Sequence, residues 1–234
     1  MKALYLDDCY LKEFDATVES VKDDKYIVLN QTAFYPNAGG QPYDTGKFVR
    51  ISDNNEFPVV YAAKFGDLIS HEVSEPGLKK GDKIKGIIDW DRRYMFMRMH
   101  TAAHVLSRVI HEQAGANTSG NQLGLDQSRI DFTLDNLDRD AIAGWIDKAN
   151  ELIAKKTPVE IKEITREEAQ KVLEGPSKHL MADMDVLRLV DIKGVDQQTC
   201  GGTHLKNIGE IGKIEFVKVK NKGANNRRIY YTVK

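Results

Sequence analysis

Two short motifs place metal-binding side chains at regular spacing. His100 and His104 stand four residues apart in MHTAAHVLS, and Cys200 and His204 stand four apart in TCGGTH. On a helix, a spacing of four puts both imidazoles on one face. Two glycines between Cys200 and His204 let that backbone fold tightly. Thiolate and neutral imidazole are preferred zinc ligands, so these four residues predict one tetrahedral zinc ion per chain.

The same residues leave two questions open. A buried thiol beside unrelated histidines is the alternative to a metal site. Thr101 follows His100 where a HExxH metalloprotease has its general-base glutamate, which disfavours protease chemistry. Four protein ligands are typical of a structural zinc, and a catalytic role would need a weak ligand or an expanded coordination shell.

The elements that must position these residues differ between the two parts of the chain. Residues 1–89 contain short β-rich runs separated by glycine and proline, with no long helical pattern. Such spacing favours a small barrel or a sandwich, and we predict a small antiparallel β-barrel domain. The expected strands are Ala16–Val21, Tyr26–Leu29, Phe48–Ile51, Val59–Ala62 and Ile84–Trp90.

From residue 90 to residue 234 the pattern predicts an α+β domain, so the chain as a whole is α+β. Apolar residues recur at helical spacing over Arg92–Glu112 and Asp138–Lys156. A third helix is expected to start at Thr165, with Glu168 completing a capping box, and to stop at Gly175-Pro176. The expected strands are Val159–Ile164, Val186–Ile192, Ile214–Val219 and Ile229–Val233.

Composition limits the class of protein. The 234 residues carry a net charge of -1, which excludes nucleic-acid binding through bulk positive charge but not through a local basic patch. Two cysteines cannot form a disulfide framework. No segment has the roughly 20 apolar residues that span a bilayer, and the N-terminus lacks a secretory pattern. We therefore expect a cytoplasmic protein.

Motifs in both parts of the chain resemble a known family. MHTAAHVLS, SRIDF at Ser128–Phe132, TCGGTHLKNIGEIGKIEF at Thr199–Phe216 and KGANNRRI at Lys222–Ile229 are similar to the editing domain of alanyl-tRNA synthetase. FYPNAGGQPYDTG at Phe34–Gly46 resembles the Gly-rich motif of the free-standing AlaX-type editing proteins. The length leaves no room for an aminoacylation core. The sequence departs from the family at one position. Where the family has a run of three glycines, this chain has Ala38 followed by Gly39 and Gly40, and then Gln41.

The resemblance implies an aminoacyl-tRNA deacylase that acts on mischarged tRNA for alanine. The bond to be hydrolysed is the ester of serine, with glycine as a second substrate. It also implies that His100, His104, Cys200 and His204 hold the zinc. The implied partner is the tRNA; no membrane and no obligate protein partner is expected.

Polar residues after the first long helix are the candidates for substrate binding. The resemblance places the substrate pocket beside this segment, although an ordinary polar loop has the same composition. Arg129 and Asp131 alternate along SRIDF and form either a structural ion pair or part of the pocket. The loop candidates are Asn117, Thr118, Ser119 and Asn121. No motif marks a carboxylate as the general base.

Basic residues near the C-terminus are the candidates for tRNA binding, because phosphates require a local positive patch. A solvated surface is the alternative. Phe34 and Tyr35 could stack on an RNA base or belong to the barrel core. His71, His111 and His179 are expected at the surface. The basic candidates are Lys218, Lys220, Lys222, Arg227 and Arg228, together with Arg92 and Arg93.

Three other functions compete with the deacylase. A non-catalytic RNA-binding module with a structural zinc would share the basic hairpin and the four ligands. A metallohydrolase for small esters is disfavoured, because no open three-ligand site with a neighbouring glutamate is evident. An editing protein of the threonyl-tRNA synthetase type would share both ligand motifs, but KGANNRRI and the Gly-rich motif favour the alanine system.

Overall fold

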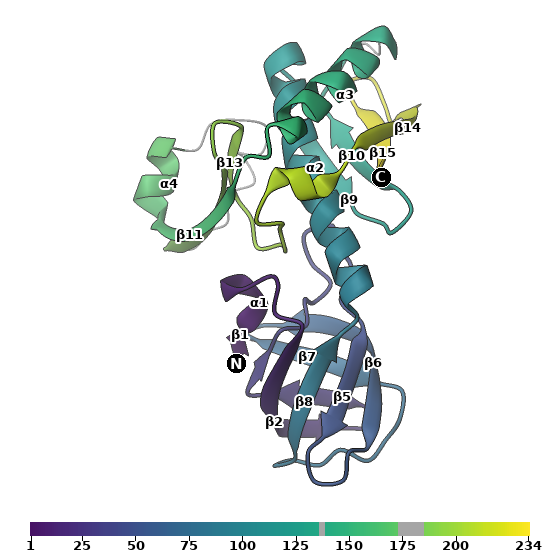
Figure 1. The fold of residues 1–234 in the computed structure, drawn as a ribbon, viewed down its shortest axis with the longest axis vertical. Coiled ribbons are helices and arrows are strands. Elements are labelled where there is room, and N and C mark those ends of the chain that lie inside the picture. Colours follow the sequence, from purple (N-terminus) through teal and green to yellow (C-terminus); the bar gives the residue numbers. More distant parts are fainter. Residues whose placement is uncertain (136–138, 173–184) are drawn as a thin grey trace. The chain divides into compact units, whose positions relative to one another are not determined.

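The chain divides into two compact units, Met1–Phe96 and Met97–Lys234. The computed structural model describes residues 1–135, 139–172 and 185–234 (Figure 1). The predicted α+β class and the predicted β-barrel are confirmed. The domain boundary between residues 89 and 90 stays a prediction.

The first unit contains a closed barrel in which every pair of neighbouring strands is antiparallel. Its strand order is β2-β3-β7-β6-β5-β8, and β3 follows β2 directly along the chain. A short parallel pair, β1 with β4, and one helical turn, α1, lie outside the closed barrel. The bounds are β1 Lys2–Ala3, α1 Leu4–Asp7, β2 Glu13–Lys22, β3 Tyr26–Leu29, β4 Gln31–Thr32, β5 Gly46–Arg50, β6 Glu56–Phe65, β7 Leu68–Val73 and β8 Lys83–Ile88.

Local sequence explains how this barrel closes. Phe14, Ala16 and Val18 alternate along β2 and point into the core, as the period of a strand requires. Asp23 and Asp24 turn β2 into β3 with φ of 54° and 52°, values that aspartate tolerates better than most residues. Strands β2 and β3 therefore form an antiparallel hairpin.

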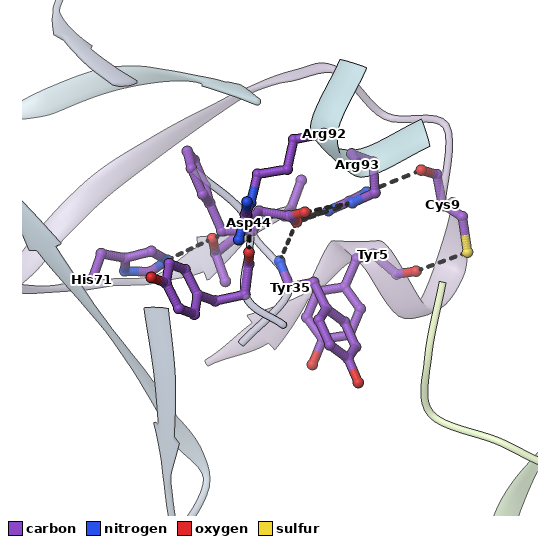
Figure 2. Close-up of polar contacts among 11 residues, drawn as sticks. Tyr5, Cys9, Tyr35, Asp44, His71, Arg92 and Arg93 are labelled. Carbon is purple, nitrogen blue, oxygen red and sulfur yellow. Dashed lines mark hydrogen bonds and ion pairs between the residues drawn. The ribbon is translucent and has the colours of Figure 1, made fainter. Parts of the chain in front are cut away.

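Arg93 anchors the start of the long helix in the first unit. Its guanidinium group is fully buried and forms an ion pair with Asp44, which also accepts a hydrogen bond from the Tyr35 amide (Figure 2). Arg93 further donates to the carbonyls of Cys9 and Ala33. Breaking a buried pair by removing one partner costs about 3–5 kcal/mol, so this network is structural.

His71 lies inside the barrel and not at the surface, so that prediction was wrong. Its ring is fully buried, with Nδ1 3.0 Å from the Ile27 carbonyl and Nε2 2.8 Å from the Thr32 hydroxyl (Figure 2). Because a carbonyl accepts only, Nδ1 carries the proton and Nε2 accepts from Thr32. Burial lowers the pKa of His71 from 6.5 to about 4, despite the opposing bond to Ile27. Both ring nitrogens are thus satisfied in the neutral form.

The second unit holds two antiparallel sheets and the helices that accompany them. One sheet has the order β14-β15-β10-β9 and the other β11-β12-β13 (Figure 1). Helix α2, Trp90–Ala114, begins in the first unit and continues into the second. The other bounds are β9 Thr118–Gln122, β10 Ser128–Phe132, α3 Arg139–Ala154, β11 Val159–Thr165, α4 Arg166–Val172, β12 Val186–Ile192, β13 Asp196–Thr199, η2 Ile208–Ile211, β14 Ile214–Asn221 and β15 Arg227–Val233.

Helix α2 begins and ends where its sequence directs. The Asp89 carboxylate accepts from the Arg92 amide, and the Asp89 carbonyl accepts from the Arg93 amide. Gly115 follows the last turn with φ of 66°, and its amide donates to the His111 carbonyl. The resulting helix runs two residues beyond each end of the predicted one, from Trp90 to Ala114.

Several elements differ from the sequence predictions. The polar segment expected to be a loop is strand β9, and β7, β13 and the short α1 were not anticipated. The capping box is confirmed, since the Glu168 amide donates to the Thr165 hydroxyl. Gly175-Pro176 and His179 lie outside the described residues.

Within the described part of the chain, no helix combines the length and the apolar character needed to cross a membrane.

Candidate metal centre and active site

The four predicted ligand residues come together in the second unit. One ligand atom from each of His100, His104, Cys200 and His204 lies within 4.8 Å of every other. His100 Nε2 is 3.5 Å from Cys200 Sγ, and His204 Nε2 is 3.3 Å from the same sulfur. Tetrahedral zinc with ordinary bond lengths requires nitrogen–sulfur separations of about 3.5 Å. The donor set and its spacing therefore fit a zinc ion.

Two elements supply the ligands. His100 and His104 project from successive turns of α2, with ring centroids 5.4 Å apart. Cys200 follows the last residue of β13, and its amide donates to the Arg188 carbonyl across the strand pair. The Arg188 guanidinium donates to the carbonyls of Cys200 and Gly202, at 2.7 and 2.9 Å. Arg188 thereby fixes the loop that carries the cysteine.

The electrostatics of the cluster favour the protonation states in which Cys200 and His204 can bind a metal. Burial raises the pKa of Cys200, but its interactions with the imidazoles of His100 and His204 lower it well below its ordinary value. Burial is also the main reason that the pKa of His204 is lowered, so this imidazole is neutral. Thiolate and neutral imidazole are the forms that bind metal.

His104 behaves differently. Burial lowers its pKa, but hydrogen bonds with Asp196 and Cys200 outweigh burial and raise the pKa to about 10. The Asp196 carboxylate lies 3.1 Å from Nδ1 of His104. A metal bound at this imidazole would therefore displace a proton.

The predicted substrate residues lie along β9, an edge strand. Thr118 is buried, and its hydroxyl has no hydrogen-bond partner among the described residues; the same holds for the Asn121 side-chain oxygen. Ser119 is exposed and accepts from Asn226 at 3.3 Å. Asn117 is exposed just before the strand. Thr118 and Ser119 thus differ sharply in their environments.

Arg129 and Asp131 form an ion pair, one of the two predicted alternatives. The Asp131 carboxylate lies 2.9 Å from Arg129 and 2.7 Å from Arg228 of the neighbouring strand β15. Burial raises the pKa of Asp131, but hydrogen bonds and charge from the two arginines lower it overall. Asp131 is therefore ionised and offsets part of the positive charge of Arg228.

The basic hairpin β14–β15 contains exposed lysines and one buried arginine. Lys218, Lys220 and Lys222 are exposed, and the first two lie over the Tyr230 ring at 4.7 and 5.9 Å. Arg227 is buried, and its guanidinium donates to backbone carbonyls around the hairpin turn and to the Asp135 carbonyl. Its prediction as a phosphate contact was wrong, because its donors are used within the protein.

The other arginine candidates lie in the first unit. The buried ion pair of Arg93 with Asp44 removes it from contact with phosphates, so that prediction was also wrong. Arg92 is half-buried, donates to the Tyr43 carbonyl at 3.1 Å and lies over the Phe96 ring (Figure 2). Its role toward tRNA stays a prediction.

The Gly-rich motif forms a tight turn beside the barrel core. Gly39 and Gly40 have φ of 57° and 82°, and an antiparallel bridge joins Ala38 to the buried Gln41. Phe34 and Tyr35, just before this turn, are also buried, which supports their place in the core over base stacking.

Asp196 and Arg188 are site residues that sequence reasoning missed. Asp196 contacts His104, which is distant in the sequence, and Arg188 binds the loop that carries Cys200. Neither residue belongs to the two motifs whose spacing predicted the ligands. The one available indication was the position of Asp196, four residues before Cys200.

Comparison with known proteins agrees with this architecture. The family described as threonyl and alanyl tRNA synthetase second additional domain matches residues 187–230, which include Cys200 and His204. The family described as class II (A) tRNA synthetases matches residues 5–92.

Curated relatives match almost the whole chain. The alanyl-tRNA editing protein AlaX-M of Methanosarcina barkeri is 53% identical, over 99% of this chain and 98% of its own length. The AlaX-M protein of Saccharolobus solfataricus is 38% identical over 99% of this chain and 98% of its own length. The alanine–tRNA ligase of Pyrococcus furiosus is 36% identical over 98% of this chain but 25% of its own length. The chain belongs to the AlaX-M family of alanyl-tRNA editing proteins.

Proposed function

We propose that this protein is a zinc-dependent hydrolase that removes serine, and secondarily glycine, from mischarged tRNA for alanine. The observation that carries the proposal is the convergence of two helix histidines with Cys200 and His204, in a chain of the editing family. We assign one zinc ion to His100, His104, Cys200 and His204. Bound there, zinc would supply Lewis-acid chemistry toward the ester carbonyl.

The need for a separate editing site follows from the size of the amino acids. A pocket that admits alanine rejects an analogue with one extra hydroxyl by only about 10²-fold, so a second, hydrolytic selection is required. That second site must form a favourable contact with the serine hydroxyl. A buried polar group that pairs with serine is left unpaired by alanine, at a cost of about 1–3 kcal/mol.

Thr118 is the residue we assign to this discrimination. Its hydroxyl is buried and lacks a partner among the described residues, as expected of a group that a substrate completes. Asn121 offers a second such atom. Exposed Asn117 and Ser119, and the Arg129–Asp131 pair, are assigned to the rim of the same site, in supporting roles.

For tRNA binding we assign the exposed lysines of the basic hairpin. Lys218 and Lys220 are exposed on the edge strand β14, Lys222 is exposed in the turn that follows it, and Arg228 and Arg92 remain secondary candidates. The turn Gly39-Gly40-Gln41 is assigned to the same substrate. No obligate protein partner is included in the proposal.

The test is a deacylation assay with purified protein on seryl, glycyl and alanyl esters of tRNA for alanine. We expect rapid loss of the seryl ester, slower loss of the glycyl ester and little loss of the alanyl ester. His104→Ala should lose metal and activity together. Full metal content in a Cys200→Ala, His204→Ala double variant would contradict the ligand assignment.

A structural zinc in a non-catalytic RNA-binding module is the second candidate, favoured by the four protein ligands. Such a module would protect the seryl ester from hydrolysis instead of cleaving it. Adding the seryl ester of tRNA for threonine to the same assay tests the remaining rival. Faster cleavage of that ester would favour an editing protein of the threonyl-tRNA synthetase type.

A further inference from the structure

Two of the ligand histidines have a polar partner behind the ring. Asp196 contacts His104, and Thr101 contacts His204. We propose that Asp196 and Thr101 are positioning residues of the metal centre, each fixing the orientation and tautomer of one ligand imidazole. The inference rests on the metal site of the proposed function and adds the residues that determine how tightly that site holds metal.

The Asp196–His104 contact determines which nitrogen of His104 faces the centre. The Asp196 side chain is fully buried, and its Oδ2 lies 3.1 Å from Nδ1 of His104. A carboxylate oxygen accepts, so Nδ1–H of His104 donates, and in the neutral, metal-binding form of the ring the lone pair is on Nε2. Ligand histidines commonly donate their second N–H to a carboxylate in this way, which fixes the ring and raises its basicity.

The Thr101 hydroxyl plays the same part at His204 that the Asp196 carboxylate plays at His104. Nδ1 of His204 lies 3.2 Å from the Thr101 hydroxyl oxygen, while Nε2 faces Cys200 Sγ at 3.3 Å. The same hydroxyl oxygen accepts from the Leu205 amide at 3.2 Å. Thr101 thus holds both the ring of His204 and the backbone that follows it.

Thr101 gains a function that its position in the motif did not suggest. It occupies the place next to His100 where a HExxH protease has its base, but here the side chain is fully buried behind a ligand. It is therefore placed to orient a ligand and not to contact substrate.

The location of Asp196 couples it to the cysteine ligand. Strand β13 begins with Asp196 and ends one residue before Cys200, and Asp196 pairs with Ile192 of β12. Gly194, with φ of 67°, forms the tight turn between the two strands. One short strand therefore delivers both a ligand and the group that orients another ligand.

The experiment measures zinc affinity by competition with a chromophoric chelator, using the full chain without tRNA. The variants are Asp196→Ala, Asp196→Asn, Thr101→Val and Thr101→Ser. Removing outer partners typically weakens metal affinity about 10–100-fold, and we expect this for Asp196→Ala and Thr101→Val. Asp196→Asn and Thr101→Ser retain an acceptor and should recover part of the affinity.

The matched control is Asp191→Asn, on the neighbouring strand. Asp191 is as buried as Asp196, but its carboxylate pairs with Lys193 at 3.4 Å. This variant should bind zinc like the unchanged protein. Circular dichroism of each metal-free variant separates loss of metal affinity from loss of folding.

A second readout reports the tautomer. In the zinc-loaded protein, ¹⁵N shifts of His104 should show a protonated Nδ1, and Asp196→Ala should make that proton exchange faster with solvent. Unchanged zinc affinity and unchanged exchange in Asp196→Ala and Thr101→Val would overturn the inference and leave the deacylase proposal intact. Weakened affinity in these variants of a protein that cleaves no ester would support the inference and overturn the proposed function.

Discussion

At the scale of single residues, Thr118 and Ser119 are neighbours on β9 with opposite surroundings. Thr118 is buried with a hydroxyl that has no partner in the described part of the chain, and Ser119 is exposed and paired with Asn226. We expect Thr118→Val to lower kcat/KM for the seryl ester about 10–100-fold, because the serine hydroxyl is then buried without a polar partner. The glycyl ester, which has no side chain, should be little affected.

Ser119→Ala is the matched control for this experiment and should change the two esters equally and weakly. The measurement is kcat/KM for each ester in each variant, with zinc content determined in parallel. An equal reduction on both esters in Thr118→Val would assign Thr118 to folding or to the catalytic step instead of to serine recognition.

From the burial of His71 we predict how the stability of the barrel changes at acid pH. Its pKa is lowered by burial from 6.5 to about 4, so between these values the unfolded chain binds a proton that the folded barrel does not. The contribution of His71 is fully present above pH 6.5 and is lost as pH falls toward 4. The lost free energy of unfolding is about 3 kcal/mol.

The test follows urea unfolding by Trp90 fluorescence in a Trp145→Phe background, from pH 7 to pH 4. His71→Asn keeps a donor for the Ile27 carbonyl but cannot titrate, so its stability should depend less steeply on pH. His111→Gln, in the second unit, is the control and should keep the original slope. Identical slopes in His71→Asn and its parent would show that His71 is not the group responsible.

At the scale of elements, hydrophobic pattern predicted some strands and missed others for identifiable reasons. Strand β12 has a buried run, and its predicted bounds are confirmed. Strands β9 and β13 are edge strands of polar sequence, TSGNQ and DQQT, so backbone pairing to one neighbour defines them instead of apolar spacing. In β7 the core position of His71 interrupted the expected alternation.

The residues of the candidate site also divide into those that the sequence could predict and those that it could not. The ligand set could be predicted because the spacing of His100 and His104 on a helix brings them together without knowledge of the fold. Asp196 could not, because its contact with His104 joins residues 92 positions apart and depends on how β13 lies beside α2. Arg93 and Arg227 were misassigned because charge alone does not reveal a guanidinium satisfied by buried carbonyls.

The hairpin β14–β15 carries a prediction about tRNA binding. If Lys218, Lys220 and Lys222 contact phosphates, replacing all three by glutamine should raise KM for tRNA. The salt dependence of binding should also become shallower, by about 0.7–0.9 in log–log slope for each phosphate that is no longer neutralised. Zinc content should not change, because these lysines are exposed on the edge strand β14 and in the turn that follows it.

The charge-matched control replaces Lys148, Lys155 and Lys171, which are exposed outside this sheet. This triple variant should keep the original slope. An unaltered slope in the hairpin variant would leave these lysines as a solvated surface.

At the scale of the whole molecule, a bound metal ion is expected to stabilise one of the two units and not the other. All four ligands belong to Met97–Lys234, and the closed barrel belongs to Met1–Phe96. A ligand that binds only the folded form stabilises it by about 2.7 kcal/mol when present at 100 times its dissociation constant. Zinc should therefore stabilise the second unit directly.

The tryptophans allow this prediction to be tested in the intact chain. Trp90 contacts Tyr10 and Tyr94 in the first unit, whereas Trp145 lies on α3 of the second. With Trp90→Phe and Trp145→Phe variants, each unit is followed separately during urea unfolding, with zinc or with chelator. We expect the chelator to lower the midpoint reported by Trp145 and to leave the Trp90 midpoint in place, because barrel packing involves no ligand residue. Equal shifts of both midpoints would mean that the chain unfolds as one cooperative body and that the predicted division into two domains has no thermodynamic counterpart.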